Sequence, residues 1–295
     1  MAHRLHMGWR TSKPVTEIKM NASKITALLA GLALTATSAF ADVSPVQSSV
    51  RPLGLDIVDK VQAAATDDAS KTFQADVLPD LTKLINTKLS ETHKIDDSGM
   101  LLDPSKLKLK TDSDVRVYFV GEGAGYANTL GFTTDGSGKA SSDTAKLIFP
   151  NASSRVSTYD PKSGVSRTAN EPLLPGDFVN LGAHKGGSQL DFFLVANGAN
   201  GSKTTFSTQK SVNPDGINHV ISFAYAMKDS PYLILGFEDL LGGGDRDFND
   251  LIFAVDIGAI NVGALTATPE PATYATMAAF LGLGAVLVRR RQSTK

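Results

Sequence analysis

The stretch YLILGFEDLLGGGDRDFNDLIFAV, residues 232–255, places an acidic, glycine-rich segment between two apolar runs. The runs Tyr232–Leu235 and Leu251–Val255 have the composition of buried strands, and the glycines between them let the backbone turn tightly. The stretch therefore predicts a β-hairpin with an acidic loop, around which the rest of the chain is organised.

The charge of this loop indicates a bound cation. Five carboxylates and one arginine leave it with four net negative charges, and such crowding is unfavourable unless a cation lies among them. Calcium takes about six to eight oxygen ligands, which carboxylates and Asn carbonyls supply. The expected ligands are Glu238, Asp239, Asp245, Asp247, Asn249 and Asp250. The alternative is an exposed acidic loop that is simply solvated.

An EF-hand is the nearest known variant of such a loop. The spacing of Asp245, Asp247 and Asn249 fits its first three ligand positions. However, Asp250 stands where the EF-hand needs glycine for its sharp turn, and Leu251–Val255 suits a buried strand better than a loop. The sequence therefore favours a calcium loop on a β scaffold.

Strand-like runs also recur through the middle of the chain. They are Val115–Val120, Lys146–Phe149, Leu190–Val195, Thr204–Thr208 and Val220–Met227, the last with Ile221, Phe223 and Tyr225 on one face. Turn signals such as Leu174–Asp177 and Asn213–Gly216 separate them. Many short strands without intervening helices predict a mainly β domain over 111–260, an antiparallel β-sandwich or jelly roll.

A linker and a short helical segment are predicted before the strands, over residues 42–110. Helix-compatible patterns cover Leu55–Ala65 and Thr72–Leu89, with Pro79 near a helix start or kink. We expect the helices, within 53–92, to form a cap on the sheet domain. After Asp256 the chain turns to small residues and is expected to be flexible.

Residues 1–41 are predicted to hold upstream residues and a secretory signal peptide. A start at Met20 places Lys24 before the apolar stretch Ile25–Ala36, and a small-x-small cleavage site precedes Asp42. Whether translation begins at Met1 or Met20 stays open.

Residues 261–295 end in a second apolar segment. Tyr274–Val288 carries no charge and is followed by Arg289-Arg290-Arg291. A bilayer span normally takes about 20 apolar residues. This segment is short by that measure, but it is expected to act as a transmembrane segment. The arginines are expected to stay cytoplasmic, which leaves the body of the protein on the far side, in agreement with the signal peptide.

Two resemblances follow from these motifs. Pro269-Glu270-Pro271, the apolar segment and the arginine cluster resemble the PEP-CTERM sorting signal. That resemblance implies export across the inner membrane of a Gram-negative bacterium, processing by an exosortase, and a surface or extracellular place linked to exopolysaccharide and biofilm. The body, roughly 115–257, resembles domain-of-unknown-function family 4114 through Gly125–Gly131, Phe192–Gly198 and Gly236–Asp250, which implies a β-rich extracellular domain.

The composition of the chain excludes several classes of function. The absence of cysteine excludes disulfides and thiolate chemistry, and a net charge of −1 gives no reason to expect nucleic-acid binding. Gly-x-Ser-x-Gly and His-Glu-x-x-His are absent, and His93, His184 and His219 are expected in surface or turn positions. We therefore expect a non-enzymatic surface or matrix protein that binds calcium and is associated with polysaccharide. The alternatives are a secreted carbohydrate-active hydrolase, with Glu238 and Asp250 as its acid pair, and a purely structural adhesive module.

Overall fold

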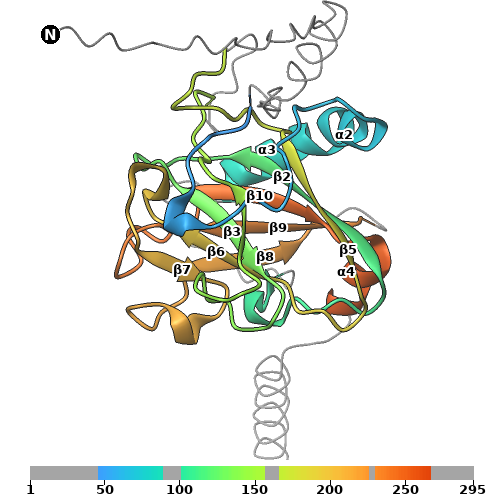
Figure 1. Ribbon diagram of the computed structural model, residues 1–295. Coiled ribbons are helices and arrows are strands. Elements are labelled where there is room, and N and C mark those ends of the chain that lie inside the picture. The colour runs from blue at the N-terminus through green and yellow to red at the C-terminus, as the bar shows by residue number, and fades with distance from the viewer. Residues whose placement is uncertain (1–45, 89–100, 157–165, 226–229, 267–295) are drawn as a thin grey trace, which may run out of the picture. The chain divides into compact units, whose positions relative to one another are not determined.

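Two antiparallel sheets form the framework of the part of the chain that the computed structural model describes, residues 46–88, 101–156, 166–225 and 230–266 (Figure 1). The larger sheet has the strand order β1-β8-β9-β10-β2-β5 and the smaller one β4-β3-β6-β7. The strands are β1 (Leu101–Leu102), β2 (Ser113–Gly121), β3 (Thr129–Thr133), β4 (Lys146–Phe149), β5 (Phe178–His184), β6 (Asp191–Val195), β7 (Thr205–Ser207), β8 (Val220–Ala224), β9 (Tyr232–Phe237) and β10 (Leu251–Asp256). The mainly β, antiparallel fold is thus confirmed.

The predicted signal peptide and sorting tail lie outside the described residues. Among the helices that the structure describes, none is both long and apolar enough to cross a bilayer.

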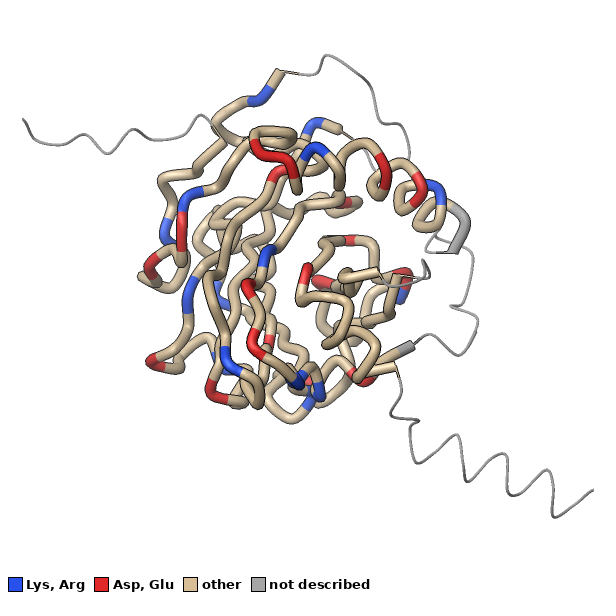
Figure 2. Tube along the Cα trace, turned by 90° about the vertical axis from the view of Figure 1, so that its right-hand side faces the viewer, with Lys and Arg blue, Asp and Glu red and all other residues tan. Residues whose placement is uncertain are grey.

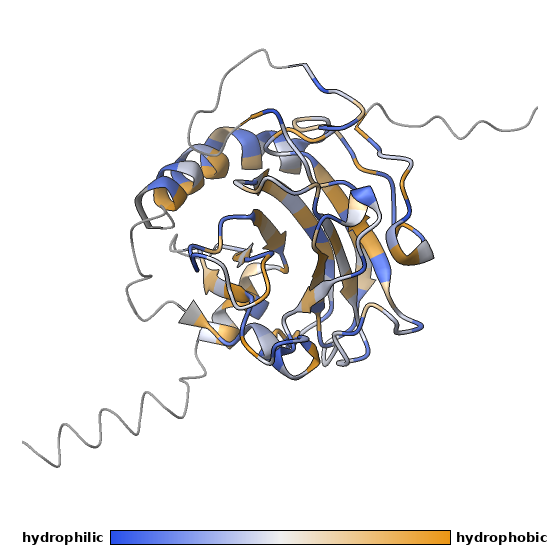
Figure 3. Cartoon of the chain, turned by 90° about the vertical axis from the view of Figure 1, so that its left-hand side faces the viewer, coloured by the Kyte–Doolittle hydropathy of each residue, from blue (hydrophilic) through white to orange (hydrophobic). Residues whose placement is uncertain are grey.

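β10 is buried on both faces, which explains its unbroken apolar run. Leu251, Phe253 and Val255 belong to the core between the sheets, whereas its other apolar residues face the opposite side of the larger sheet. Phe253 meets Phe192 of β6 across the two sheets, with ring centroids 5.2 Å apart. A strand covered on both faces needs apolar residues at successive positions, and Figure 3 shows the strands as largely orange.

The second face of the larger sheet is covered by helices. These helices form one continuous helical segment: α2 (Asp68–Thr72), the π-helical turn η2 (Phe73–Val77) and α3 (Leu78–Lys88). Phe73 stacks on Tyr118 of β2 with centroids 3.9 Å apart. The outer cluster also contains Val77, Leu81, Ile85, Ile221, Phe223 and Tyr225. Ile221, Phe223 and Tyr225 share a face of β8 and the chain after it, as predicted. The helical segment packs on this face of the sheet, which is the position expected of the predicted cap.

The predicted helix over Leu55–Ala65 is wrong. The only helical turn next to it is the three-residue 3-10 turn η1 (Pro52–Gly54). The segment itself forms isolated β-bridges, Ile57 with Leu147 and Gln62 with Phe178. The Val58 N–H donates to the Leu147 carbonyl at 2.9 Å, and the Gln62 N–H donates to the Phe178 carbonyl at 2.8 Å. β4 and β5 are edge strands, and these bonds supply partners for their open backbone groups.

The expectation of a flexible chain after Asp256 is wrong for its first residues. Helix α4 (Ala259–Thr266) follows β10 and crosses the predicted boundary between 260 and 261. Asn261 is 1% exposed, and its side-chain oxygen accepts from the backbone N–H groups of Lys110 and Thr111 at 2.8 and 2.9 Å. These buried hydrogen bonds hold α4 against the body of the domain.

An ion pair joins the helical segment to the larger sheet. Asp67 is the N-cap of α2, and its carboxylate accepts from the Ser70 N–H at 2.7 Å. Arg116 of β2 donates to both oxygens of this carboxylate, at 3.0 and 2.8 Å, and its guanidinium lies 4.3 Å from the Phe178 ring centre. The hydrogen bond from Arg116 lowers the pKa of Asp67 from 3.8 to about 2.

Replacing Asp67 by Asn is expected to lower the free energy of unfolding at neutral pH by about 1 kcal/mol, because the cap acceptor stays and only the charge-assisted bonds are lost. The pKa of Asp67 is lower in the folded than in the unfolded state. Its contribution is therefore complete above about pH 4 and is lost as the pH falls toward 2. Urea denaturation of both proteins at about pH 6 and about pH 2.5 measures this. A difference that does not shrink in acid would contradict the ionic link.

Candidate functional site

The acidic loop joins β9 and β10, as predicted. The two strands pair antiparallel, with Leu251 opposite Phe237 where the loop leaves the sheet. Gly236 allows the loop to fold back on β9, since a Cβ at this position would lie 2.3 Å from the Phe248 carbonyl oxygen. The loop is thus fixed at both ends by strands in the interior of the larger sheet.

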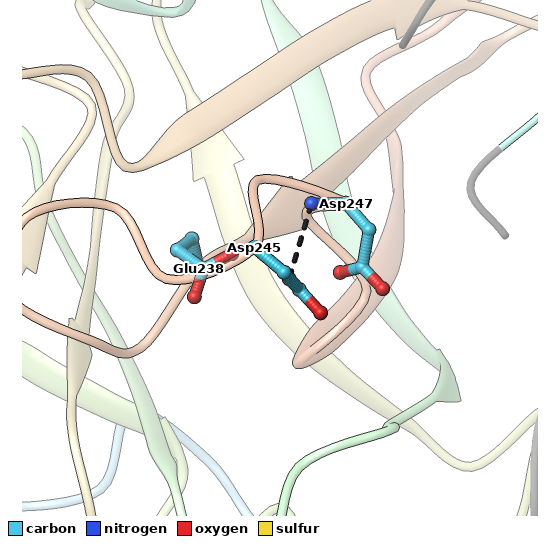
Figure 4. A group of neighbouring side chains, drawn as sticks. All are labelled: Glu238, Asp245 and Asp247. Carbon is cyan, nitrogen blue, oxygen red and sulfur yellow. Dashed lines mark hydrogen bonds between the residues drawn. The ribbon is translucent and has the colours of Figure 1, made fainter. Parts of the chain in front are cut away.

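The five carboxylates of the loop form two groups that share Glu238. Glu238, Asp245 and Asp247 form one group (Figure 4), and Glu238, Asp239 and Asp250 form the other. Within each group one oxygen of every residue lies within 4.8 Å of the others. Glu238, Asp239 and Asp247 are at most 5% exposed, whereas Asp245 is exposed. The structure therefore brings all five predicted carboxylates together.

Asn249 adjoins these groups through a repeated turn. The Asp247 N–H donates to the Asp245 carboxylate at 3.4 Å, and the Asn249 N–H donates to the Asp247 carboxylate at 3.1 Å. The Asn249 side-chain amide also donates to Asp247. Between these residues Arg246 and Phe248 have φ values of 64° and 55°. Such a backbone is unfavourable for residues with a side chain, and strained residues of this kind cluster at functional sites.

The electrostatics of the loop disfavour its charged form. Burial, and then the charges of neighbouring carboxylates, raise the pKa values of Glu238 and Asp239 and raise the pKa of Asp250 to about 8. No lysine or arginine of the described residues forms an ion pair with Glu238, Asp239 or Asp250. Figure 2 shows the basic residues spread over many parts of the chain. A cation with oxygen ligands would offset this repulsion.

The loop between β2 and β3 supports the site from outside the hairpin. The Asn128 side-chain amide donates to Asp239 at 2.7 Å, and the Gly123 N–H donates to the Asn249 carbonyl at 3.0 Å. Burial raises the pKa of Glu122 to about 7, and the charge of Asp239 adds to this shift. Glu122 is thus a further carboxylate near the acidic groups. The sequence does not predict that Glu122 lies near these groups, because nothing in its own turn indicates a contact with a loop far along the chain.

His219 was expected in a surface or turn position; it lies in the turn that leads into β8, but it is not at the surface. It is fully buried and stacks on Phe206 with centroids 3.8 Å apart. Its Nδ1 lies 3.1 Å from the Glu238 carbonyl oxygen and its Nε2 lies 2.8 Å from the Asp215 carboxylate. Asp215 also accepts from the Gly242 N–H at 2.8 Å. The turn before β8 therefore holds the acidic loop in place.

Comparison with known families agrees with part of the predicted resemblance. The family described as Domain of unknown function (DUF4114) matches residues 185–258, which include β6 to β10 and the acidic loop. The predicted resemblance also covered residues 115–184, which lie outside this match. No curated protein and no solved structure matches the chain.

Proposed function

We propose that this is an exported, non-enzymatic cell-surface or extracellular-matrix protein whose β domain binds calcium and is associated with exopolysaccharide. The observation that carries the proposal is the pair of carboxylate groups around the buried Glu238, with oxygens within 4.8 Å of one another. Carboxylate oxygens are the ligands that calcium prefers, and its flexible coordination tolerates a site built from one irregular loop.

The calcium ligands are proposed to be Glu238, Asp239, Asp245, Asp247, Asn249 and Asp250. The two carboxylate groups share Glu238, so the same loop has room for one or two ions. Magnesium is a poorer fit, because it demands a stricter octahedral geometry and releases its water reluctantly.

Titration calorimetry of the full-length protein with CaCl2 tests this proposal. We expect saturable binding in the wild type and a large loss of affinity in Asp250→Asn, which retains an acceptor for the Asp239 N–H, at 2.8 Å from the Asp250 carboxylate in the wild type. The matched control is Asp143→Ala, which removes an exposed carboxylate between β3 and β4. Absence of heat at millimolar calcium would contradict the proposal.

The hydrolase alternative receives less support from the same geometry. Glycosidases place two carboxyl groups about 5–9.5 Å apart with the sugar between them. Oxygens of Glu238 and Asp250 lie within 4.8 Å of each other and of Asp239, so three carboxylates crowd one point. This arrangement favours ligation of a cation over acid–base work on a substrate.

Export is proposed from the two ends of the sequence. The small-x-small site before Asp42 and the motif at Pro269–Pro271 motivate processing at both ends. We expect the mature protein to begin near Asp42 and to lack the arginines at 289–291. Intact-mass measurement of secreted or surface material determines both ends. A mature species that retains the arginines and stays in the inner membrane would contradict processing by an exosortase.

A further inference from the structure

A cavity of about 490 Å³ lies beside the acidic loop. Three segments line it: Tyr126 from the β2–β3 loop, Asn197 and Thr204 from the β6–β7 connection, and Leu240 and Leu241 from the β9–β10 loop. Asp239 lines it as well. Pockets for small ligands usually measure about 300–1,000 Å³, so the cavity has room for one or two sugar rings.

Two polar side chains of the cavity wall, Asn197 and Thr204, keep groups that the protein does not use. The Asn197 side-chain oxygen accepts from the Ala127 N–H at 3.1 Å and from the Asn200 amide at 2.8 Å, which fixes the orientation of the side chain. Within the described residues, neither the side-chain amide nitrogen of Asn197 (Nδ2) nor the Thr204 hydroxyl has a hydrogen-bond partner. Both groups therefore retain their capacity to bind a ligand.

An aromatic ring completes this wall. Tyr126 is 42% exposed, although large aromatic side chains are usually well buried. Its ring offers a flat, electron-rich face and its hydroxyl offers a polar edge. A pyranose ring has the complementary form, with an apolar face of C–H groups and a rim of hydroxyls.

We propose that this cavity binds a saccharide unit of a hydroxyl-rich polysaccharide, with the sugar ring on Tyr126 and its hydroxyls bonded to Asn197 and Thr204. The inference rests on the proposed function in one respect, because the acidic loop forms one wall of the cavity. It adds to that function the place of binding and the class of ligand.

A lipid bilayer is the competing occupant, since Leu240 and Leu241 are 45% and 60% exposed. However, these leucines line the same concavity as Asn197, Thr204 and Asp239. Inserting the loop into lipid would remove water from those polar groups without replacing their hydrogen bonds, which costs about 2–7 kcal/mol for each group. The lining therefore favours a sugar.

Affinity electrophoresis of the full-length protein tests the inference. Native gels with calcium contain dextran, galactomannan, xylan or alginate, and we expect at least one of them to retard the wild type. Tyr126→Ala is expected to weaken binding about tenfold or more, which corresponds to about 1.4 kcal/mol. Tyr126→Phe keeps the ring and should retain binding, while Thr204→Val should weaken it. The control is Ile260→Ala, which removes a 67% exposed apolar side chain on α4.

Several outcomes would overturn the inference. They are retardation by none of the four polysaccharides, equal retardation of the wild type and Tyr126→Ala, and binding to phosphatidylglycerol vesicles that is lost in Leu241→Ser without any retardation by polysaccharide.

Calcium calorimetry on the same samples separates the two proposals. Retardation that depends on Tyr126, without calcium heat, would refute the calcium proposal alone and support the saccharide site. Calcium heat without retardation would refute the saccharide site alone.

Discussion

Calcium is expected to raise the melting temperature by about 5–10 °C when the free ion is about a hundredfold above its Kd. An ion that binds only the folded state stabilises it by RT ln(1 + [L]/Kd), about 2.7 kcal/mol at this ratio. A domain of this size shifts by about 2–4 °C for each kcal/mol. Differential scanning calorimetry with CaCl2 and with EGTA measures the shift.

Variants of the acidic loop test the origin of this shift. Asp247→Ala and Asp250→Ala should abolish it, because each removes a carboxylate from one of the two groups. Asp143→Ala removes an exposed carboxylate elsewhere and should leave it intact. Magnesium should give a smaller shift. If chelation leaves the melting curve of the wild type unmoved, the loop is a solvated acidic turn.

The effect of Asp250→Asn on the melting temperature is expected to change sign when calcium is removed. Burial and the neighbouring charges disfavour the ionised form of Asp250. Asn has no charge at this position and still offers an oxygen to the Asp239 N–H. In EGTA, Asp250→Asn is therefore expected to melt above the wild type, although it loses the stabilisation by calcium.

Phe253→Ala is expected to lower the free energy of unfolding by about 3–5 kcal/mol, the range for removing a large buried side chain. Phe253 is fully buried and its ring lies 5.2 Å from that of Phe192 and 6.1 Å from that of Phe237. The loss is a large share of the roughly 5–15 kcal/mol that stabilise most domains. Urea denaturation measures it.

The control for this variant is Ile260→Ala, which changes an exposed residue and should alter stability by about 0.5 kcal/mol or less. A loss below about 1 kcal/mol for Phe253→Ala would mean that the two sheets do not depend on a shared core.

The predicted strands with a strong apolar pattern are confirmed, and the strands that were missed have a physical reason. β3 has Gly131 at its centre, and glycine normally marks a turn. Here a Cβ would lie 2.2 Å from the ring of Phe193, its partner on β6, so glycine leaves the space that this ring occupies. β5 contains Asn180 and also Gly182, with φ of 86°, next to a register shift against β2. Its pattern of alternation is therefore broken.

The error over Leu55–Ala65 has a different cause. Its apolar residues recur at intervals that a helix also shows, but the segment bonds to Leu147 and Phe178, both far along the chain. Tertiary pairing overrides a weak local preference, and no local pattern reports it.

The candidate site also contains some residues that the sequence predicts and others that it does not. Its carboxylates could be predicted because they are adjacent in sequence and their charge needs an explanation. Asn128, Asp215 and His219 could not, because their contacts with the loop come from distant strands and turns. Sequence proximity therefore identified the residues of the cluster, while the groups that orient it required the fold.

The position of β10 between β9 and β2 has a consequence for folding kinetics. Val255 lies opposite Leu233, a near neighbour in sequence, and also opposite Val117, more than a hundred residues earlier. Pairs so distant form late, because the entropy of closing a long loop opposes them until many contacts form together. The Gly123–Asn249 hydrogen bond ties the acidic loop to the chain that follows β2. An ion would find its complete site only after this step, so calcium should slow unfolding far more than it speeds folding.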